Sequence, residues 1–362
     1  MSGETVPVPT GTSETDLMPP EPTGIDVGPV SQWLERNVAD ATGPFRFDLI
    51  AGGHSNLTYR VVGSDGHALV LRRPPLGPLL ASAHDMGREH RIIAALADTP
   101  VPVAPARGYC EDPSVTGAPF YVMDFVDGHV IRDRDAAEHT LATGARRMAG
   151  DDLVDTLAAI HAVDVEAVGL ADLARHEGYI ARQLKRWYGQ WQQSQTRDLP
   201  AIDRVHDLLA SRIPSQGPAT IVHGDYRLDN TMVGDDGRVV AVLDWEICTL
   251  GDPLADVGLL VVYWTGPGDE PSAWTGSATT AEGFPDRADV LSRYSAASGR
   301  DLSGIDFYVA FAFWKLACIV EGVYARYLAG ALGGERDPSE FDTFRLQVDH
   351  AAAQAAAHAS AL

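Results

Sequence analysis

The sequence of 362 residues has few cysteines and few positive charges, and both shortages restrict what the chain can do. It contains three cysteines, at the widely spaced positions 110, 248 and 318, with no C-x-x-C pair. This spacing argues against a zinc site or a disulfide framework and favours a reducing compartment. The 50 acidic residues exceed the 28 basic ones, which gives a formal net charge of −22. Such a charge opposes binding to nucleic acid and to anionic lipid surfaces.

Long apolar runs and export signals are also lacking. The first residues contain no basic segment followed by an apolar stretch of the kind that marks a signal peptide. The longest apolar run, Phe307 to Val320, is interrupted by Lys315 and is short for a membrane span of about 20 residues. We therefore expect a buried helix in this run, no membrane partner and a cytoplasmic location.

The pattern of turns and apolar residues divides the chain into three parts. Residues 1–29 are rich in Pro, Thr, Gly and acid, so we expect a disordered tail. Residues 30–126 contain a hairpin signature, in which Leu57 to Val62 and Ala68 to Arg72 flank a Ser-Asp-Gly turn. Residues 127–362 are mainly helical apart from a β-rich stretch between Ala219 and Trp245. The prediction is an α+β, bilobal fold with a small β-rich N-terminal lobe and a larger, mainly helical C-terminal lobe.

The most informative segment is His-Gly-Asp-Tyr-Arg-Leu-Asp-Asn at residues 223–230, which Asp244 follows after one more predicted hairpin. Phosphoryl transfer requires a carboxylate that orients or deprotonates the acceptor hydroxyl, and oxygen ligands that hold magnesium against the nucleotide phosphates. Asp225 is the candidate for the first role, and Asn230 and Asp244 are the candidates for the second. A simpler alternative is that these side chains make only turn hydrogen bonds. That alternative does not account for the second acidic motif.

The N-terminal part contains features that suit the handling of phosphates. A glycine-rich turn can expose backbone N–H groups to a phosphate, and here it comprises Gly52, Gly53, His54, Ser55 and Asn56. Arg72 ends the second strand of the predicted hairpin, where a kinase presents a cation to the phosphates, and Glu89 is its candidate ion-pair partner. Ordinary alternatives are a common hairpin turn, a solvated strand end and an exposed helix acid.

These motifs resemble those of the aminoglycoside phosphotransferase and choline kinase family, which has a protein-kinase-like fold. The resemblance runs from Gly52 to Asp256 and so covers most of the chain. Within this family the chain is most similar to the kinase-like domains fused to acyl-CoA dehydrogenases. The segments that carry this similarity are Gly-Gly-His-Ser-Asn at 52–56, Leu-Arg-Arg-Pro-Pro at 71–75, Phe-Tyr-Val-Met-Asp-Phe at 120–125, Arg-Gln-Leu-Lys-Arg-Trp at 182–187 and Leu-Asp-Trp-Glu-Ile-Cys at 243–248.

The resemblance implies roles for further residues. Met123, Asp124 and Phe125 would form the hinge whose backbone pairs with adenine. Asp256 would brace the catalytic loop through backbone N–H groups, and His223 would orient the same loop. Helix capping is the ordinary alternative for Asp256, and plain core packing is the alternative for Met123.

The activity that the resemblance implies is ATP- and Mg²⁺-dependent transfer of the γ-phosphoryl group to a hydroxyl of a small molecule. It favours a hydroxyacyl-CoA as the acceptor, with Arg182, Lys185 and Arg186 as candidate contacts for its phosphates. An ordinary solvated helix face is the alternative for these three residues. Two other functions stay open: an antibiotic phosphotransferase that acts on aminoglycosides, and a nucleotide-binding pseudokinase. The family usually has lysine where this chain has Arg72, and the two cations differ in geometry and hydration.

Overall fold

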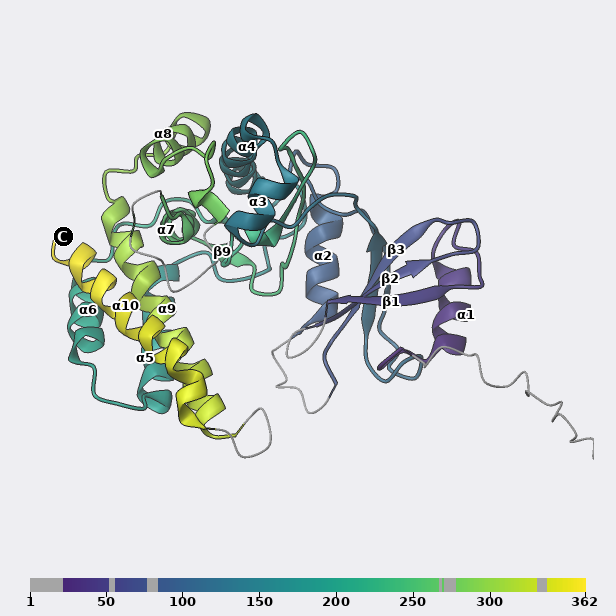
Figure 1. The fold of residues 1–362 in the computed structure, drawn as a ribbon, viewed down its shortest axis with the longest axis horizontal. Coiled ribbons are helices and arrows are strands. Elements are labelled where there is room, and N and C mark those ends of the chain that lie inside the picture. The colour runs from purple at the N-terminus through teal and green to yellow at the C-terminus, as the bar shows by residue number, and fades with distance from the viewer. Residues whose placement is uncertain (1–21, 52–55, 77–83, 267–268, 270–277, 331–336) are drawn as a thin grey trace, which may run out of the picture. The chain divides into compact units, whose positions relative to one another are not determined.

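The computed structural model describes residues 22–51, 56–76, 84–266, 269, 278–330 and 337–362. They form two compact units (Figure 1). One contains the residues up to 87 together with 107–123, and the other contains 88–106 together with 124–362. The first unit is built on a β-sheet and the second is mainly helical. The predicted α+β class, with a β-rich N-terminal part and a helical C-terminal part, is confirmed.

A five-stranded sheet with the strand order β1-β2-β3-β5-β4 organises the first unit. The predicted hairpin is present, since β2 and β3 pair antiparallel with Tyr59 opposite Leu71. Side chains alternate between the two faces of a strand, so Tyr59, Val61 and Leu71 enter one apolar core, to which helix α1 adds Val30 and Leu34. The elements are α1 (Val27–Asn37), β1 (Arg46–Ala51), β2 (Leu57–Val62), β3 (Ala68–Arg73), β4 (Ala106–Cys110) and β5 (Phe120–Asp124).

The chain just before α1 belongs to this unit, so the predicted disordered tail at 1–29 is too long. Ile25 is buried in the same apolar core, and α1 begins at Val27. The hydroxyl of Thr116 donates to the carbonyl of Gly24 at 2.9 Å, and the guanidinium of Arg73 donates to the same carbonyl. The prediction of disorder is wrong for residues 22–29, because one buried isoleucine and these hydrogen bonds outweigh the polar composition of the segment.

Helix α9 (Ile305–Leu328) is the core of the second unit and packs against α5, α6, α7 and α10. Within the described residues it is the one helix long and apolar enough to cross a membrane, and 83% of its apolar window is buried inside the structure. The predicted buried helix is therefore confirmed. The other helices are α2 (Met86–Leu96), which begins at the end of the first unit, and α3 (Arg134–Thr140), α4 (Thr143–Ala162), α5 (Tyr179–Ser194), α6 (Pro200–Ser211), α7 (Leu254–Tyr263), α8 (Arg287–Ser298) and α10 (Asp342–Ala359).

Two short β-ladders interrupt the helices of the second unit and carry the motif residues. β6 (Thr220–Val222) pairs with β9 (Thr249–Gly251), and β7 (Thr231–Val233) pairs with β8 (Val239–Val242), both antiparallel. Three 3-10 turns complete the described structure, at η1 (Leu228–Asn230), η2 (Ala278–Thr280) and η3 (Pro338–Phe341).

Candidate active site

The acidic and amide side chains of the motif are arranged around the hairpin of β7 and β8. β6 ends directly before His223, and η1 then leads into β7. Across the hairpin, Thr231 lies opposite Val242. Leu243 donates its backbone N–H to the carbonyl of Asn230 at 2.9 Å. The β7–β8 hairpin therefore brings Asn230 next to Leu243, the residue that precedes Asp244.

Asn230 holds Asp225 in place. Its Nδ2 donates to the Asp225 backbone carbonyl and to Oδ2 of the Asp225 carboxylate, at 2.8 Å in each case. A side-chain amide has two N–H donors and one acceptor oxygen, so these bonds account for both donors. The amide oxygen remains as an acceptor or a metal ligand.

Asp244 has a left-handed backbone conformation, with a φ of 60°. This conformation costs a residue with a side chain about 1–2 kcal/mol, and Asp tolerates it better than most. Backbone strain of this kind concentrates at functional sites, where other contacts hold the geometry. Asp244 is the second residue after β8, and its strained backbone supports a functional role for it.

Arg227 places a cation beside the Asp225 carboxylate. Its Nε lies 3.6 Å from Oδ2 of Asp225 and 3.0 Å from Oδ1 of Asp229, and its guanidinium lies 4.8 Å from the ring centre of Tyr263. Burial would lower the pKa of Arg227, but the negative charges around it, first that of Asp225, outweigh burial and raise the pKa. Burial, and then the charge of Asp225, raise the pKa of Tyr263. The carboxylate therefore faces a permanent cation and a neutral phenol.

Asp256 connects α7 to the loop that carries Asp225. It is almost fully buried, and its two carboxylate oxygens accept the backbone N–H groups of His223 at 2.7 Å and of Gly224 at 2.9 Å. Burial alone would raise its pKa, but the hydrogen bond from His161 and the backbone N–H of Gly224 help to lower it. These are the backbone contacts expected of Asp256, and they fix the two residues that precede Asp225.

His223 makes contacts through both ring nitrogens, one within its own loop and one to the end of the β7–β8 hairpin. Nε2 lies 2.9 Å from the carbonyl oxygen of Leu243, and Nδ1 lies 3.4 Å from the backbone nitrogen of Asp225. Since a carbonyl accepts and an N–H donates, this network corresponds to a neutral imidazole protonated on Nε2. His223 therefore links the loop that carries Asp225 to the end of the hairpin that carries Asp244.

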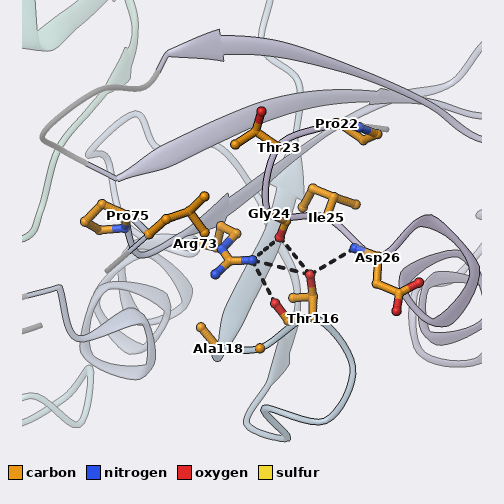
Figure 2. A pocket seen from close by; sticks show the side chains of 11 residues that line it. Pro22, Thr23, Gly24, Ile25, Asp26, Arg73, Pro75, Thr116 and Ala118 are labelled. Atoms are coloured by element: carbon orange, nitrogen blue, oxygen red, sulfur yellow. Dashed lines mark hydrogen bonds between the residues drawn. The ribbon is translucent and has the colours of Figure 1, made fainter. Parts of the chain in front are cut away.

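Two consecutive arginines at the end of β3, Arg72 and Arg73, lie on opposite faces of the sheet. Arg73 points into the first unit, where its guanidinium donates to the carbonyl of Gly24 and, at 2.8 Å, to the carbonyl of Thr116 (Figure 2). Because successive side chains of a strand point to opposite faces, Arg72 does not share this environment. Arg73 is thus a structural residue. Arg72 lies in the first unit and Glu89 in the second, and their pairing stays a prediction.

Several other predicted nucleotide contacts remain predictions. Gly52, Gly53, His54 and Ser55 lie outside the described residues, and Asn56 is buried. Met123 and Asp124 end β5, and Phe125 follows. The backbone N–H of Asp124 donates to the carbonyl of Pro105 at 2.9 Å. An adenine at this segment would therefore need backbone groups other than that N–H.

A cavity of about 290 Å³ in the second unit has Asp225 in its wall. Of the three predicted substrate cations on α5, Arg186 lines this cavity. Arg182 instead donates to the carbonyl of Arg175 at 2.8 Å, and Lys185 is exposed. The full lining is Tyr179, Gln183, Arg186, Trp187, Gly224, Asp225, Ile247, Thr249, Leu259, Tyr263, Lys315, Leu316 and Ile319.

The site also contains residues that the sequence reasoning did not single out. Lys315 and Trp187 line the cavity, and Arg227 and Tyr263 flank the Asp225 carboxylate. The signal for Lys315 was present in the sequence, because a lysine in the middle of an apolar helix is costly unless something meets its charge. Tyr263 lies at the end of an apolar helix and carried no such signal.

The donor set suits magnesium held together with a nucleotide. In the described part of the chain, no group of three or more His, Cys, Asp or Glu side chains forms a metal site. Magnesium bound to nucleotide phosphates usually takes only one or two protein ligands, and phosphates and water complete its octahedron. The free amide oxygen of Asn230 and the carboxylate of Asp244 match that requirement.

The sequence model of the family described as "Phosphotransferase enzyme family" matches residues 46–302. This match spans β1 to the end of α8 and includes every residue of the motif. The chain belongs to this family. Membership makes it a phosphotransferase that uses a hydroxyl group as the acceptor, and it agrees with the predicted family.

Curated relatives of this phosphotransferase include two acyl-CoA dehydrogenase family members. It is 36% identical to family member 10 of Mus musculus over 294 residues, and this match covers 80% of this chain and 27% of the relative. It is 34% identical over 282 residues to family member 11 of Homo sapiens, which covers 77% of this chain and 36% of the relative. The match thus covers 27% and 36% of the length of these two relatives. Both relatives agree with the predicted resemblance to kinase-like domains fused to acyl-CoA dehydrogenases.

Solved structures of phosphotransferases share the fold. A Ralstonia eutropha protein of the aminoglycoside phosphotransferase type is 33% identical, with a TM-score of 0.78 over 92% of this chain and 98% of its own. The aminoglycoside phosphotransferase APH(4)-Ia, a ternary complex with AMP-PNP and hygromycin B, is 15% identical, with a TM-score of 0.58 over 90% and 98% of the two chains. The second likeness concerns the fold alone.

Proposed function

We propose that this phosphotransferase is an ATP- and magnesium-dependent small-molecule kinase of the cytoplasm, and that its acceptor is a hydroxyacyl-CoA. The main support for kinase activity is the hydrogen bond from Asn230 to the Asp225 carboxylate. Asn230 directly precedes the β7–β8 hairpin, and Asp244 follows it. One carboxylate is thereby oriented for the acceptor, and the Asn230 amide oxygen and the Asp244 carboxylate are oxygen ligands of the kind that magnesium prefers. Two of the three catalytic groups are thus tied to each other before any ligand binds.

In this proposal Asp225 accepts the hydroxyl proton of the acceptor as the phosphoryl group is transferred, and no covalent enzyme intermediate forms. Asn230 and Asp244 would hold Mg²⁺, which would supply charge neutralisation at the transferring phosphate. Asp256 and His223 keep the loop in position. Arg72, with Glu89, contacts the nucleotide phosphates.

Two observations support an acyl-CoA acceptor over an aminoglycoside. The curated relatives are acyl-CoA dehydrogenase family members. In addition, the described lining of the cavity beside Asp225 includes Lys315 and Arg186 and no acid besides Asp225 itself. An aminoglycoside carries several ammonium groups, and like charges in a confined site oppose binding.

The test is ATP-dependent phosphorylation of a hydroxyacyl-CoA panel and an aminoglycoside panel by the purified chain. We expect turnover with acyl-CoAs that requires Mg²⁺. A double variant, Arg182→Glu with Arg186→Glu, should weaken only the anionic acceptors, because it reverses charge on one helix face. Phosphorylation confined to aminoglycosides would overturn the acceptor. Nucleotide binding without any phosphorylation would instead indicate a pseudokinase.

A further inference from the structure

Lys315 is an ammonium group placed inside the protein next to the catalytic loop. The residue is 8% exposed, in the middle of the apolar helix α9. Its Nζ donates to the carbonyl of Gly224 at 3.3 Å and lies 5.9 Å from the ring centre of Trp187. Among the described residues, no carboxylate lies within ion-pair distance of it. A buried ammonium is costly unless it is paired, so an unpaired one calls for an explanation.

The cavity supplies that explanation. Lys315 and Asp225 line the same cavity of about 290 Å³, and Gly224, which Lys315 contacts, is the neighbour of Asp225 in the chain. An acceptor that presents its hydroxyl to Asp225 therefore lies beside Lys315. The rest of the wall is largely apolar, with Trp187 and Ile247 among its members. The cavity thus combines one acid, a buried cation and a surface for an aliphatic chain.

The use of lysine at this position adds to the argument. Only two of the 28 basic residues of the chain are lysines, Lys185 and Lys315, and all the others are arginines. An ammonium is a compact point charge that can meet a single oxygen in a narrow space, whereas a guanidinium is planar and favours a bidentate partner. The position therefore suits one oxygen atom of a ligand.

We propose, resting on the kinase function above, that Lys315 determines acceptor specificity by binding an acyl oxygen of the acceptor while Asp225 receives the hydroxyl. This oxygen belongs either to a free carboxylate or to a thioester carbonyl. Both place negative or partly negative charge against Nζ. The acceptor class is then an aliphatic hydroxy acid or its thioester, with Arg186 as a second cation in the wall.

A purely structural role makes a different prediction. If Lys315 only holds the carbonyl of Gly224, its loss would disturb the catalytic loop and slow the transfer to every acceptor alike. If it binds the acceptor, its loss would act on KM and only for acceptors that carry the acyl oxygen. The pattern across acceptors therefore separates the two roles.

The kinetic experiment compares three acceptors of equal chain length: a straight-chain hydroxy acid, its CoA thioester, and a diol that lacks the acyl oxygen. For Lys315→Met we expect KM to rise about tenfold or more for the acid, the thioester or both, with the diol unchanged. The comparison of the acid with the thioester identifies whether the site binds a free carboxylate or a thioester carbonyl. Arg134→Met, which removes an exposed cation of α3 that does not line the cavity, should change nothing. An equal loss on all three acceptors, diol included, would overturn the proposal.

A binding experiment tests the contact without turnover. Lysine labelled with ¹³C at Cε gives two resonances from this chain, and Lys185→Arg assigns them. We expect the Lys315 resonance to move on titration with the hydroxy acid or the thioester and to stay in place with the diol. If neither acyl compound moves it, the inference is wrong. A moving resonance in a protein that phosphorylates nothing would instead refute the kinase function and retain the Lys315 contact.

Discussion

His161 Nε2 lies 3.4 Å from Oδ2 of Asp256, and both side chains are buried in the second unit. The other ring nitrogen of His161 lies 2.7 Å from the hydroxyl of Tyr294. Burial, the largest effect, lowers the pKa of His161, so the ring is neutral and can donate one N–H to Asp256 while it accepts from Tyr294. The hydrogen bonds that hold the loop before Asp225 therefore extend from α7 to α4 and α8.

Asp256→Asn should weaken this brace. An amide offers one oxygen where the carboxylate offers two, so its NH₂ group would face the backbone N–H of His223 or of Gly224. We expect a loss of about 1–3 kcal/mol in the free energy of unfolding and a fall in kcat. Urea titration and steady-state kinetics measure both. Asp207→Asn, at a side chain that is 81% exposed, is the control. Unchanged stability and kcat in Asp256→Asn would remove the brace from the proposal.

Asp225→Asn should abolish most of the phosphoryl transfer, because an amide cannot accept the hydroxyl proton. A positioned general base commonly contributes on the order of 10²–10⁴-fold in rate, so kcat should fall by about that factor. Nucleotide affinity should stay close to that of the wild type, as measured by calorimetry. Near-normal turnover in this variant would exclude Asp225 from the mechanism.

Asp244→Ala should stop turnover and weaken nucleotide binding only when magnesium is present. The reason is that a hard cation prefers carboxylate oxygens, whereas binding of the magnesium-free nucleotide needs no such ligand. Calorimetric titrations with and without Mg²⁺ give the comparison. Asp235→Ala is a matched control, since it lies in the turn of the same hairpin with a side chain that is 94% exposed. Equal nucleotide affinities for Asp244→Ala and wild type in Mg²⁺ would contradict the assignment.

The sequence was sufficient to predict elements whose pattern is local. The β2–β3 hairpin follows from alternation around a Ser-Asp-Gly turn, and the motif at 223–230 lies between strands as its spacing indicated. Contacts between distant segments were not readable in this way. The ordered stretch at 22–29 depends on Thr116 and Arg73, far along the chain, and composition carries no information about such partners.

The cavity gives a second example of the same limit. Helical spacing placed Arg182, Lys185 and Arg186 on one face of α5, but only the packing of α5 against α9 determines that Arg186 is the one that lines the cavity. The same packing brings Lys315 to Gly224 across 91 residues of sequence.

Arg72 and Arg73 should respond differently to replacement by alanine. Arg72→Ala should raise the KM for ATP with little change in stability, because we assign it to the nucleotide phosphates, and Glu89→Ala should raise the same KM. Arg73→Ala should instead destabilise the first unit by about 1–3 kcal/mol, since the carbonyl groups of Gly24 and Thr116 lose a charged donor. Kinetics at varied ATP and thermal unfolding distinguish these outcomes. If Arg72→Ala and Glu89→Ala both leave the ATP dependence unchanged, the predicted pair does not contact nucleotide.

The stability of the chain should depend on pH through Lys315. Burial, the largest effect, lowers the pKa of Lys315, and the charges of Asp256 and Asp225 offset only part of this lowering. Between the lowered value and the ordinary value of about 10.4, the unfolded chain binds more protons than the folded chain at this position. The free energy of unfolding therefore rises with pH across that window.

Lys315→Met removes this dependence and is its test. At neutral pH the variant no longer buries an ammonium, which favours it, but it loses the hydrogen bond to Gly224, which costs about 1 kcal/mol at every pH. The free energy of unfolding of the wild type, minus that of the variant, should therefore increase as the pH rises from 7 to 10. Urea titrations followed by tryptophan fluorescence at several pH values measure the shift, with Lys185→Met as the control. If this difference stays constant or decreases as the pH rises, the Lys315 ammonium is already compensated within the folded protein.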